Sequence, residues 1–191
     1  MTRSMTFAAG AAVSLMISGC EKPAEVTANN AVENLDTGNN VAENAGAIAA
    51  LPAAEFANTI AASDMFEIES GKLAAEKGTS QTVRDFAAML QTDHKKSTDD
   101  LKAAGAQADP AITPAPVLTA EQLGNIDKLK GASGAEFDRL FAEQQIAAHQ
   151  KGLEALQAYS AGGDVAPLRE FATKAATVVQ GHLDKAHALG H

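Results

Sequence analysis

Four ionisable side chains lie on the apolar faces of segments that have helical periodicity: Glu67, His94, His149 and His182. An ionisable group on a buried face raises the free energy of the folded state unless it is paired, hydrogen-bonded or bound to a metal. Imidazole nitrogens and carboxylate oxygens are ligands for Zn, Fe, Cu, Ni and Mn, and helical bundles build metal sites from such groups on facing helices. The pattern therefore predicts a candidate site for one divalent transition-metal ion. Asp93, beside His94, is expected to support the ligands rather than to bind the metal.

The same four residues are also compatible with a buried network that binds nothing. Glu67 could accept hydrogen bonds from His94 or His182, and such a network would fix the register of the helices. A di-iron site has no support, because di-iron bundles place Glu three residues before His on two helices. The residues at those positions are Gln91, Ile146 and Val179. Ferroxidase or oxygenase chemistry is therefore not expected.

Apolar residues recur at three- and four-residue steps in four long segments, which is the periodicity of amphipathic helices, and a possible Thr119 cap predicts one short helix between the second and third of them. The predicted helices cover 55–77, 81–104, 120–130, 135–160 and 167–189. The flanking residues predict how the helices begin and end. Gly78 is expected to end the first helix in a left-handed conformation, Ser80, Thr119 and Asp164 to cap the helices after them, and Pro167 to lie in a first turn.

The predicted fold is all-α. The stretch 105–133 contains three prolines and only one short helix. A connection of this length allows the second and third long helices to run parallel. We therefore expect a ferritin-like four-helix bundle with this stretch as a long crossover between helices two and three.

The four site residues are predicted to lie at different levels along these helices. Counted from the turn at Gly78 with a rise of ~1.5 Å per residue, Glu67 and His94 are offset by about 7 Å. Counted from Gly162 in the same way, the two histidines of the last helical pair are offset by about 10 Å. Straight, ideal helices would not bring all four groups together.

Residues 1–20 have the pattern of a secretory signal: one charge at Arg3, then an apolar run, then Ile-Ser-Gly-Cys. The run is too short to cross a bilayer core, which needs ~20 residues. Ile-Ser-Gly-Cys resembles the lipobox of bacterial lipoproteins, whose cysteine is lipidated. The resemblance implies a lipid on Cys20 that holds the chain to the membrane on the periplasmic side of the envelope, and Glu21 favours the outer membrane. Because Cys20 is the only cysteine, its lipidation would leave no thiol for catalysis, disulfides or metal binding.

Composition divides the rest of the chain in two. Residues 21–54 are rich in Ala, Asn and Glu with little apolar bulk, which predicts a disordered tether. Residues 55–191 have the size of one domain. Without the signal, the chain has 14 basic and 24 acidic side chains, a net charge of −10. Such an acidic chain repels phosphate backbones, so no nucleic-acid partner is expected.

Three segments resemble the family catalogued as domain of unknown function 4142, a ferritin-like group of exported bacterial proteins. They are FEIESGKLA at 66–74, VRDFA at 83–87 leading to Asp93 and His94, and SGAEFD at 133–138 leading to His149. His182-Leu183 matches the histidine near the end of the family. The resemblance covers about residues 55–189. It implies a helical bundle in the bacterial envelope, in which Glu67, Asp93, His94, His149 and His182 occupy the recurring polar positions, but it implies no reaction.

Two functions follow from these observations. The first is a non-enzymatic envelope lipoprotein with a structural or interaction role, bound to the membrane through Cys20, with a protein or the cell wall as a candidate partner. The alternative is a metal-binding protein with a mononuclear Glu/His site that handles periplasmic metal or responds to stress. No glycine loop that cradles phosphate and no nucleophile elbow occurs in the sequence, so an enzyme is not expected.

Overall fold

The computed structural model describes residues 49–189, and this part of the chain is all-α, as predicted. Its helices are α1 (Ala53–Lys77), α2 (Gln81–Ala106), α3 (Ala120–Gly131), α4 (Gly134–Gly162) and α5 (Ala166–Ala188). Their bounds differ from the predicted bounds by at most two residues. The predicted signal at 1–20 with Cys20, and residues 21–48 of the predicted tether, lie outside the described residues.

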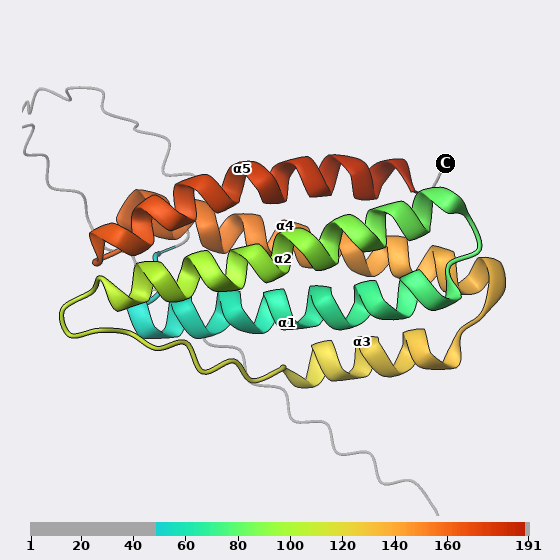
Figure 1. Cartoon of the computed structure of the whole chain (residues 1–191), viewed down its shortest axis with the longest axis horizontal. Coiled ribbons are helices and arrows are strands. Elements are labelled where there is room, and N and C mark those ends of the chain that lie inside the picture. Colours follow the sequence, from blue (N-terminus) through green and yellow to red (C-terminus); the bar gives the residue numbers. More distant parts are fainter. Residues whose placement is uncertain (1–48, 190–191) are drawn as a thin grey trace, which may run out of the picture. The chain divides into compact units, whose positions relative to one another are not determined.

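The four long helices lie side by side, and the short α3 lies along α1 (Figure 1). α1 packs against α2, and α4 packs against α5. Contacts of α2 with α5 and of α1 with α4 join these two pairs, while α3 contacts α1 and α4. In Figure 1, α2 and α4 run in the same direction, opposite to α1 and α5. All four long helices therefore contribute one face to a shared interior.

Two apolar clusters fill this interior, one toward each end of the helices. The first includes Phe56, Leu101, Leu156, Tyr159 and Leu168, and the second includes Phe86, Leu90, Leu129, Phe137 and Phe141. The residues between the clusters along α1, α2, α4 and α5 are polar although they are buried. Burial of the two clusters supplies the main driving force for folding and holds the polar middle layer in place.

Three of the predicted helix-start signals are confirmed. The Ser80 hydroxyl accepts a hydrogen bond from the Val83 amide at 3.1 Å. Thr119 and Gln122 form a reciprocal capping box, in which each side chain accepts the other residue's backbone N–H. Pro167 lies in the first turn of α5. These local interactions fix where α2, α3 and α5 begin.

Two other local predictions are wrong. Gly78 ends α1 with φ −58° and ψ 131°, which is not left-handed. It is needed for close approach instead, since a Cβ there would lie 2.6 Å from the Ala74 carbonyl oxygen and 2.7 Å from Val83 Cγ1. Asp164 does not cap α5, whose cap residue is Val165 without a side-chain hydrogen bond. The Asp164 carboxylate accepts the Tyr159 hydroxyl at 2.9 Å and is therefore occupied elsewhere.

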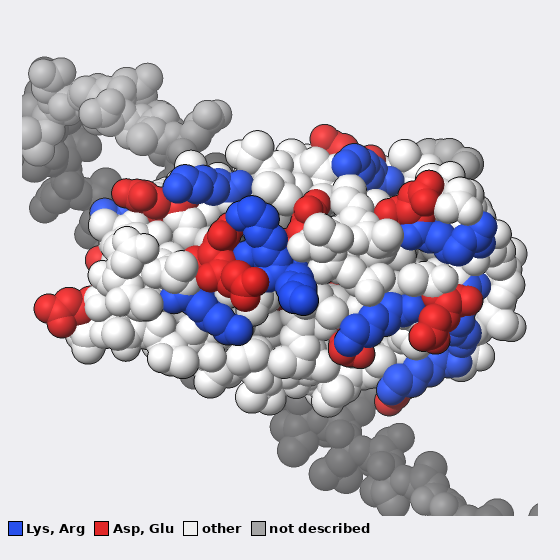
Figure 2. All heavy atoms as spheres, viewed as in Figure 1, with Lys and Arg blue, Asp and Glu red and all other residues white. Residues whose placement is uncertain are grey.

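Acidic and basic side chains are interspersed on the face shown in Figure 2. Several form exposed pairs, such as Arg139 with Glu136 and Glu143, and Lys151 with Glu121. Exposed pairs of this kind contribute little to stability. None of the helices within residues 49–189 combines the length and the apolar character that a membrane span requires.

Candidate metal centre

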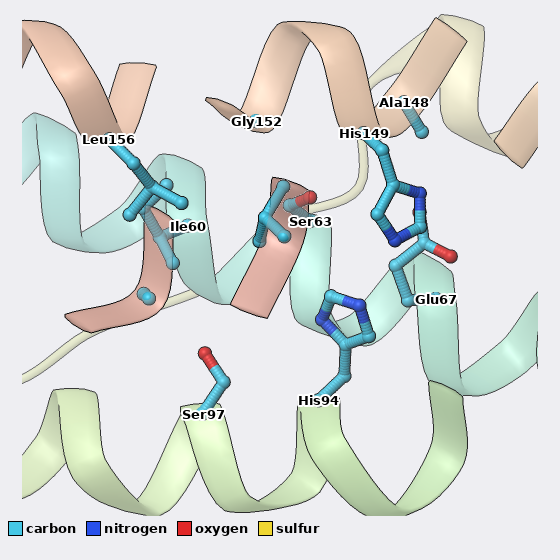
Figure 3. Close-up of a pocket in the computed structure, with 11 residues that line it drawn as sticks. Ile60, Ser63, Glu67, His94, Ser97, Ala148, His149, Gly152 and Leu156 are labelled. Carbon is cyan, nitrogen blue, oxygen red and sulfur yellow. The ribbon is translucent and has the colours of Figure 1, made fainter. Parts of the chain in front are cut away.

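Three histidines from three different helices meet in the polar middle layer. His94 comes from α2, His149 from α4 and His182 from α5, and each is at most 5% exposed. One ring nitrogen from each lies within 4.8 Å of the other two. The closest pair is His149 Nε2 and His182 Nδ1, at 3.4 Å. Figure 3 shows His94 and His149 pointing toward one another from facing helices, with Glu67 beside them.

The other nitrogen of each ring is held by an oxygen. His94 Nδ1 lies 2.8 Å from Asp64 Oδ1, and His182 Nε2 lies 2.9 Å from Asp93 Oδ2. His149 Nδ1 lies 2.8 Å from the backbone carbonyl oxygen of Gln145. An N–H that donates to such an oxygen leaves the opposite nitrogen of a neutral ring with a free lone pair. The three nitrogens that remain, His94 Nε2, His149 Nε2 and His182 Nδ1, are therefore the potential ligands.

Burial sets the protonation of these rings. It lowers the pKa of His149 to about 3, helped by the nearby charge of His94. It also lowers the pKa of His182, although the hydrogen bond with Asp93 opposes this. For His94, burial lowers the pKa, but the hydrogen bond with Asp64 and the charge of Glu67 more than offset it, and the pKa is raised. His149 and His182 are thus neutral at pH 7 and able to bind metal, while a metal at His94 competes with a proton.

Glu67 lies beside the three histidines but outside the set of converging nitrogens. Its Oε1 is 3.9 Å from His149 Nδ1, the nitrogen already held by Gln145. The side chain is 1% exposed, and neither carboxylate oxygen has a hydrogen-bond partner among the described residues. Burial raises the pKa of Glu67 to about 7, against the opposing charge of His94. The structure therefore brings together three of the four predicted ligands and places Glu67 next to them.

The spacing of the three free nitrogens suits a small metal ion. Nitrogens bound to one tetrahedral metal at 2.0–2.1 Å lie about 3.3 Å apart. The 3.4 Å between His149 and His182 already matches this value. The remaining separations, up to 4.8 Å, require His94 to move closer by about 1.5 Å.

The centre is buried, yet it adjoins solvent. A groove of about 550 Å³ runs between α2 and α5, and Asp93, His94 and His182 contribute to its wall. The Asp93 side chain is 37% exposed, whereas the His182 side chain that it holds is 3% exposed. His94 and His182 therefore lie at the wall of a groove that is open to solvent.

Comparison of the chain with known protein families identifies the family to which it belongs. The profile of the family described as Domain of unknown function (DUF4142) matches residues 38–189. The chain belongs to this family. The match confirms the resemblance to the family, and it spans all five helices of residues 49–189.

A solved structure is also similar to this DUF4142 member. It is CopM in the Cu(I)-bound form, with a TM-score of 0.60 and 17% sequence identity, and the match covers 72% of this chain and 94% of that chain. At this identity the likeness shows a shared fold alone. No curated protein matches the chain.

His149 and His182 are closer in level than the count from Gly162 predicts. The connection between α4 and α5 runs from 163 to 165. Counted from its middle, His149 and His182 are offset by about three residues, or ~4.5 Å, rather than about 10 Å. A count from Gly162 assigns the whole connection to one helix and therefore gives too large an offset. Histidine side chains span the smaller difference.

Two of the residues that orient the histidines were missed in the sequence. Asp64, which is 2% exposed, holds His94, and the Gln145 carbonyl holds His149. Asp64 lies three residues before Glu67, and this spacing puts both on one helix face. Asp64 could therefore have been identified from its spacing. The contact of the Gln145 backbone carbonyl could not, because it does not depend on the type of side chain. Asp93 was expected to support the ligands, and the structure places it against His182.

Proposed function

We propose that this protein binds one transition-metal ion through His94, His149 and His182. The observation that carries the proposal is the arrangement of the three rings: one nitrogen of each ring is held by an oxygen, and one nitrogen of each ring lies within 4.8 Å of the other two. Proteins commonly orient metal-binding histidines in this way, with the second nitrogen donating to a carboxylate or carbonyl. Imidazole ligands suit Cu, Zn, Ni and Fe. The fold shared with CopM, which was solved with Cu(I), supports copper as the first ion to test.

The pattern of unpaired atoms favours a metal over a purely structural network. In a structural network almost every buried polar atom has a partner. Here His94 Nε2 and both Glu67 oxygens are buried and have none among the described residues, as is also true of the side-chain oxygens of Gln144 and Gln145. A cation between the three rings would use the His94 nitrogen. It would also offset the cost of a buried carboxylate at Glu67, since a bound ion is the largest local charge in such a site.

The proposal includes a ferritin-like four-helix bundle, in which α1, α2, α4 and α5 surround the metal and residues 107–133 form the crossover from α2 to α4. The parallel course of α2 and α4 supports this architecture (Figure 1). The site is mononuclear in this proposal, because a second metal would need carboxylates where the chain has Gln91, Ile146 and Val179.

The proposed place of action is the periplasmic side of the bacterial envelope. The lipobox-like Ile-Ser-Gly-Cys sequence supports a lipid on Cys20 that anchors the chain, with Glu21 favouring the outer membrane. A protein in this place that holds one metal ion would serve metal handling or the response to metal stress rather than a reaction of its own. An additional protein or cell-wall partner stays a prediction.

Elemental analysis tests the proposal. Residues 21–191, without a histidine tag, would be incubated with Cu or Zn, freed from unbound ion and analysed beside the variants H94A, H149A and H187A. We expect about one ion per wild-type chain and its loss in the first two variants. H187A is the matched control, because His187 is exposed and lies outside the cluster, so it should keep the ion. A metal-free wild type, or equal loss in H187A, would contradict the proposal.

A further inference from the structure

A small cavity lies beside two of the proposed ligands. Its volume is about 20 Å³, and its polar wall consists of Ser63, Glu67, His94, Ser97 and His149 (Figure 3). A cavity needs ~10–15 Å³ to hold one water molecule. The space therefore fits a single water or another ligand of a few atoms, and nothing larger.

The Glu67 carboxylate in the cavity wall is available for hydrogen bonds to a molecule in the cavity. Glu67 lines it, is 1% exposed, and has two carboxylate oxygens without a partner among the described residues. A carboxylate accepts hydrogen bonds at both oxygens, and the hydroxyls of Ser63 and Ser97 can donate or accept. These groups can satisfy a bound water molecule, which typically makes about three hydrogen bonds.

The three histidines leave one position of a tetrahedral metal free. Metal sites with three protein ligands commonly take water or an exogenous ligand in the fourth position. Glu67 is not one of the residues whose ligand atoms lie together, and its Oε1 is 3.9 Å from His149 Nδ1, the nitrogen already held by Gln145. No other ionisable group of the described residues joins the three nitrogens. The fourth position is therefore free to face the cavity.

We infer that the metal binds one small monodentate ligand in this cavity, water in the resting state or a small anion in its place, and that Glu67 accepts hydrogen bonds from the bound water. The inference rests on the proposed metal site. A ligand from solvent has a short path, because His94, Ser97, Ala175 and Val179 form a shared wall between the cavity and the groove of α2 and α5. The protein would thus be a ligand-binding metal centre rather than a closed store for an ion.

Cobalt and azide provide the test. Co²⁺ replaces the metal, and its visible absorption changes when a ligand enters its coordination sphere. Wild-type protein loaded with one Co²⁺ is titrated with azide at pH 8, and we expect a saturable spectral change. The same titration is made with G152A and with G124A. Gly152 lines the cavity, and a Cβ there would meet only Ser63 Oγ, at 3.9 Å. The new methyl group therefore fits the fold and occupies part of the cavity.

G124A is the matched control for G152A. Both positions are helical glycines that accept a methyl group, and nothing lies within 4 Å of a Cβ at Gly124 in α3. We expect azide affinity to fall by about tenfold in G152A, since overpacking a filled cavity is unfavourable, while Co²⁺ affinity stays within about threefold in both variants. Azide affinity in G124A should equal that of wild type.

A third variant, E67Q, separates charge from volume. It keeps the size of the side chain and removes its negative charge, so azide should bind more tightly than in wild type because the anion no longer faces a carboxylate. If E67Q instead disturbed the metal site as a whole, azide would bind more weakly than in wild type. Opposite changes in G152A and E67Q therefore identify the cavity as the place of the ligand.

The possible results distinguish the inference from the proposed function. Co²⁺ binding without any spectral response to azide would overturn the inference alone, as would equal azide affinities of wild type and G152A or an equal loss in G124A. Failure of the wild type to bind Co²⁺, Cu or Zn would overturn the proposed function and the inference with it.

Discussion

Replacement of Glu67 by Gln should make the metal-free protein more stable at neutral and alkaline pH than the wild type. Glu67 is 1% exposed, and burial raises its pKa from 4.5 to about 7. The stability associated with its bound proton is fully present below pH 4.5 and is lost as the pH rises through 7. The difference between the two pKa values corresponds to about 3 kcal/mol. Gln has no proton to lose. The difference in the free energy of unfolding between E67Q and wild type should therefore be larger at pH 8 than at pH 4.5, by about 3 kcal/mol.

Urea unfolding followed by circular dichroism gives this difference at a series of pH values, with metal removed beforehand. His149, whose pKa is lowered to about 3, contributes stability that is lost as the pH falls from 6.5 through 3, but it is common to both proteins and cancels. E69Q is the matched control. The Glu69 side chain is 46% exposed and pairs with Lys72, so its difference from wild type should stay within about 0.5 kcal/mol throughout. A flat difference for E67Q would refute the burial of Glu67 as a neutral acid.

Three further changes test other parts of the account. In D64A the His94 ring loses the carboxylate that orients it, and metal affinity, measured by competition with a chelator, should fall about 10–100-fold; an unchanged affinity would count against this role. Gly78→Ala should lower the free energy of unfolding by about 1–3 kcal/mol through overpacking, because its Cβ would lie 2.6 Å from a carbonyl oxygen, whereas Gly131→Ala, with nothing within 4 Å, should not. Thr119→Ala removes a capping box and should cost about 1 kcal/mol in urea unfolding; no change would show that α3 does not depend on its cap.

The sequence was sufficient for the helices because their determinants are local. Apolar residues at helical spacing predicted the four long helices, and the Thr119 cap predicted the short one, all within two residues of the observed bounds. The cap predicted at Asp164 is wrong. A carboxylate before a helix can cap that helix, but the Asp164 carboxylate accepts a hydrogen bond from the Tyr159 hydroxyl instead. That competition depends on where a side chain five residues earlier packs, and a local pattern does not contain this information.

The site was predicted less completely than the fold. The apolar faces of the predicted helices identified His94, His149 and His182, because helical periodicity indicates which positions are buried. Which nitrogen of each ring is free depends on Asp64, on Asp93 and on a backbone carbonyl. These contacts join residues up to 89 positions apart. They follow from tilt and side-chain direction rather than from spacing along one helix. For the same reason the sequence did not show that Glu67, although it lies on the buried face of its helix, stays outside the group of histidine nitrogens.

X-ray absorption spectroscopy of the metal-loaded protein tests the central claim most directly. The chain from residue 21 to 191 would be loaded with one equivalent of Cu or Zn, and the nitrogen ligands counted from the multiple-scattering pattern that imidazole rings produce. We expect three imidazole nitrogens at about 2.0 Å from the metal and one further ligand atom that does not belong to a histidine. A spectrum with no more than one imidazole, or one dominated by carboxylate oxygens, would place the ion elsewhere on the protein and contradict the claim that the three buried histidines form its site.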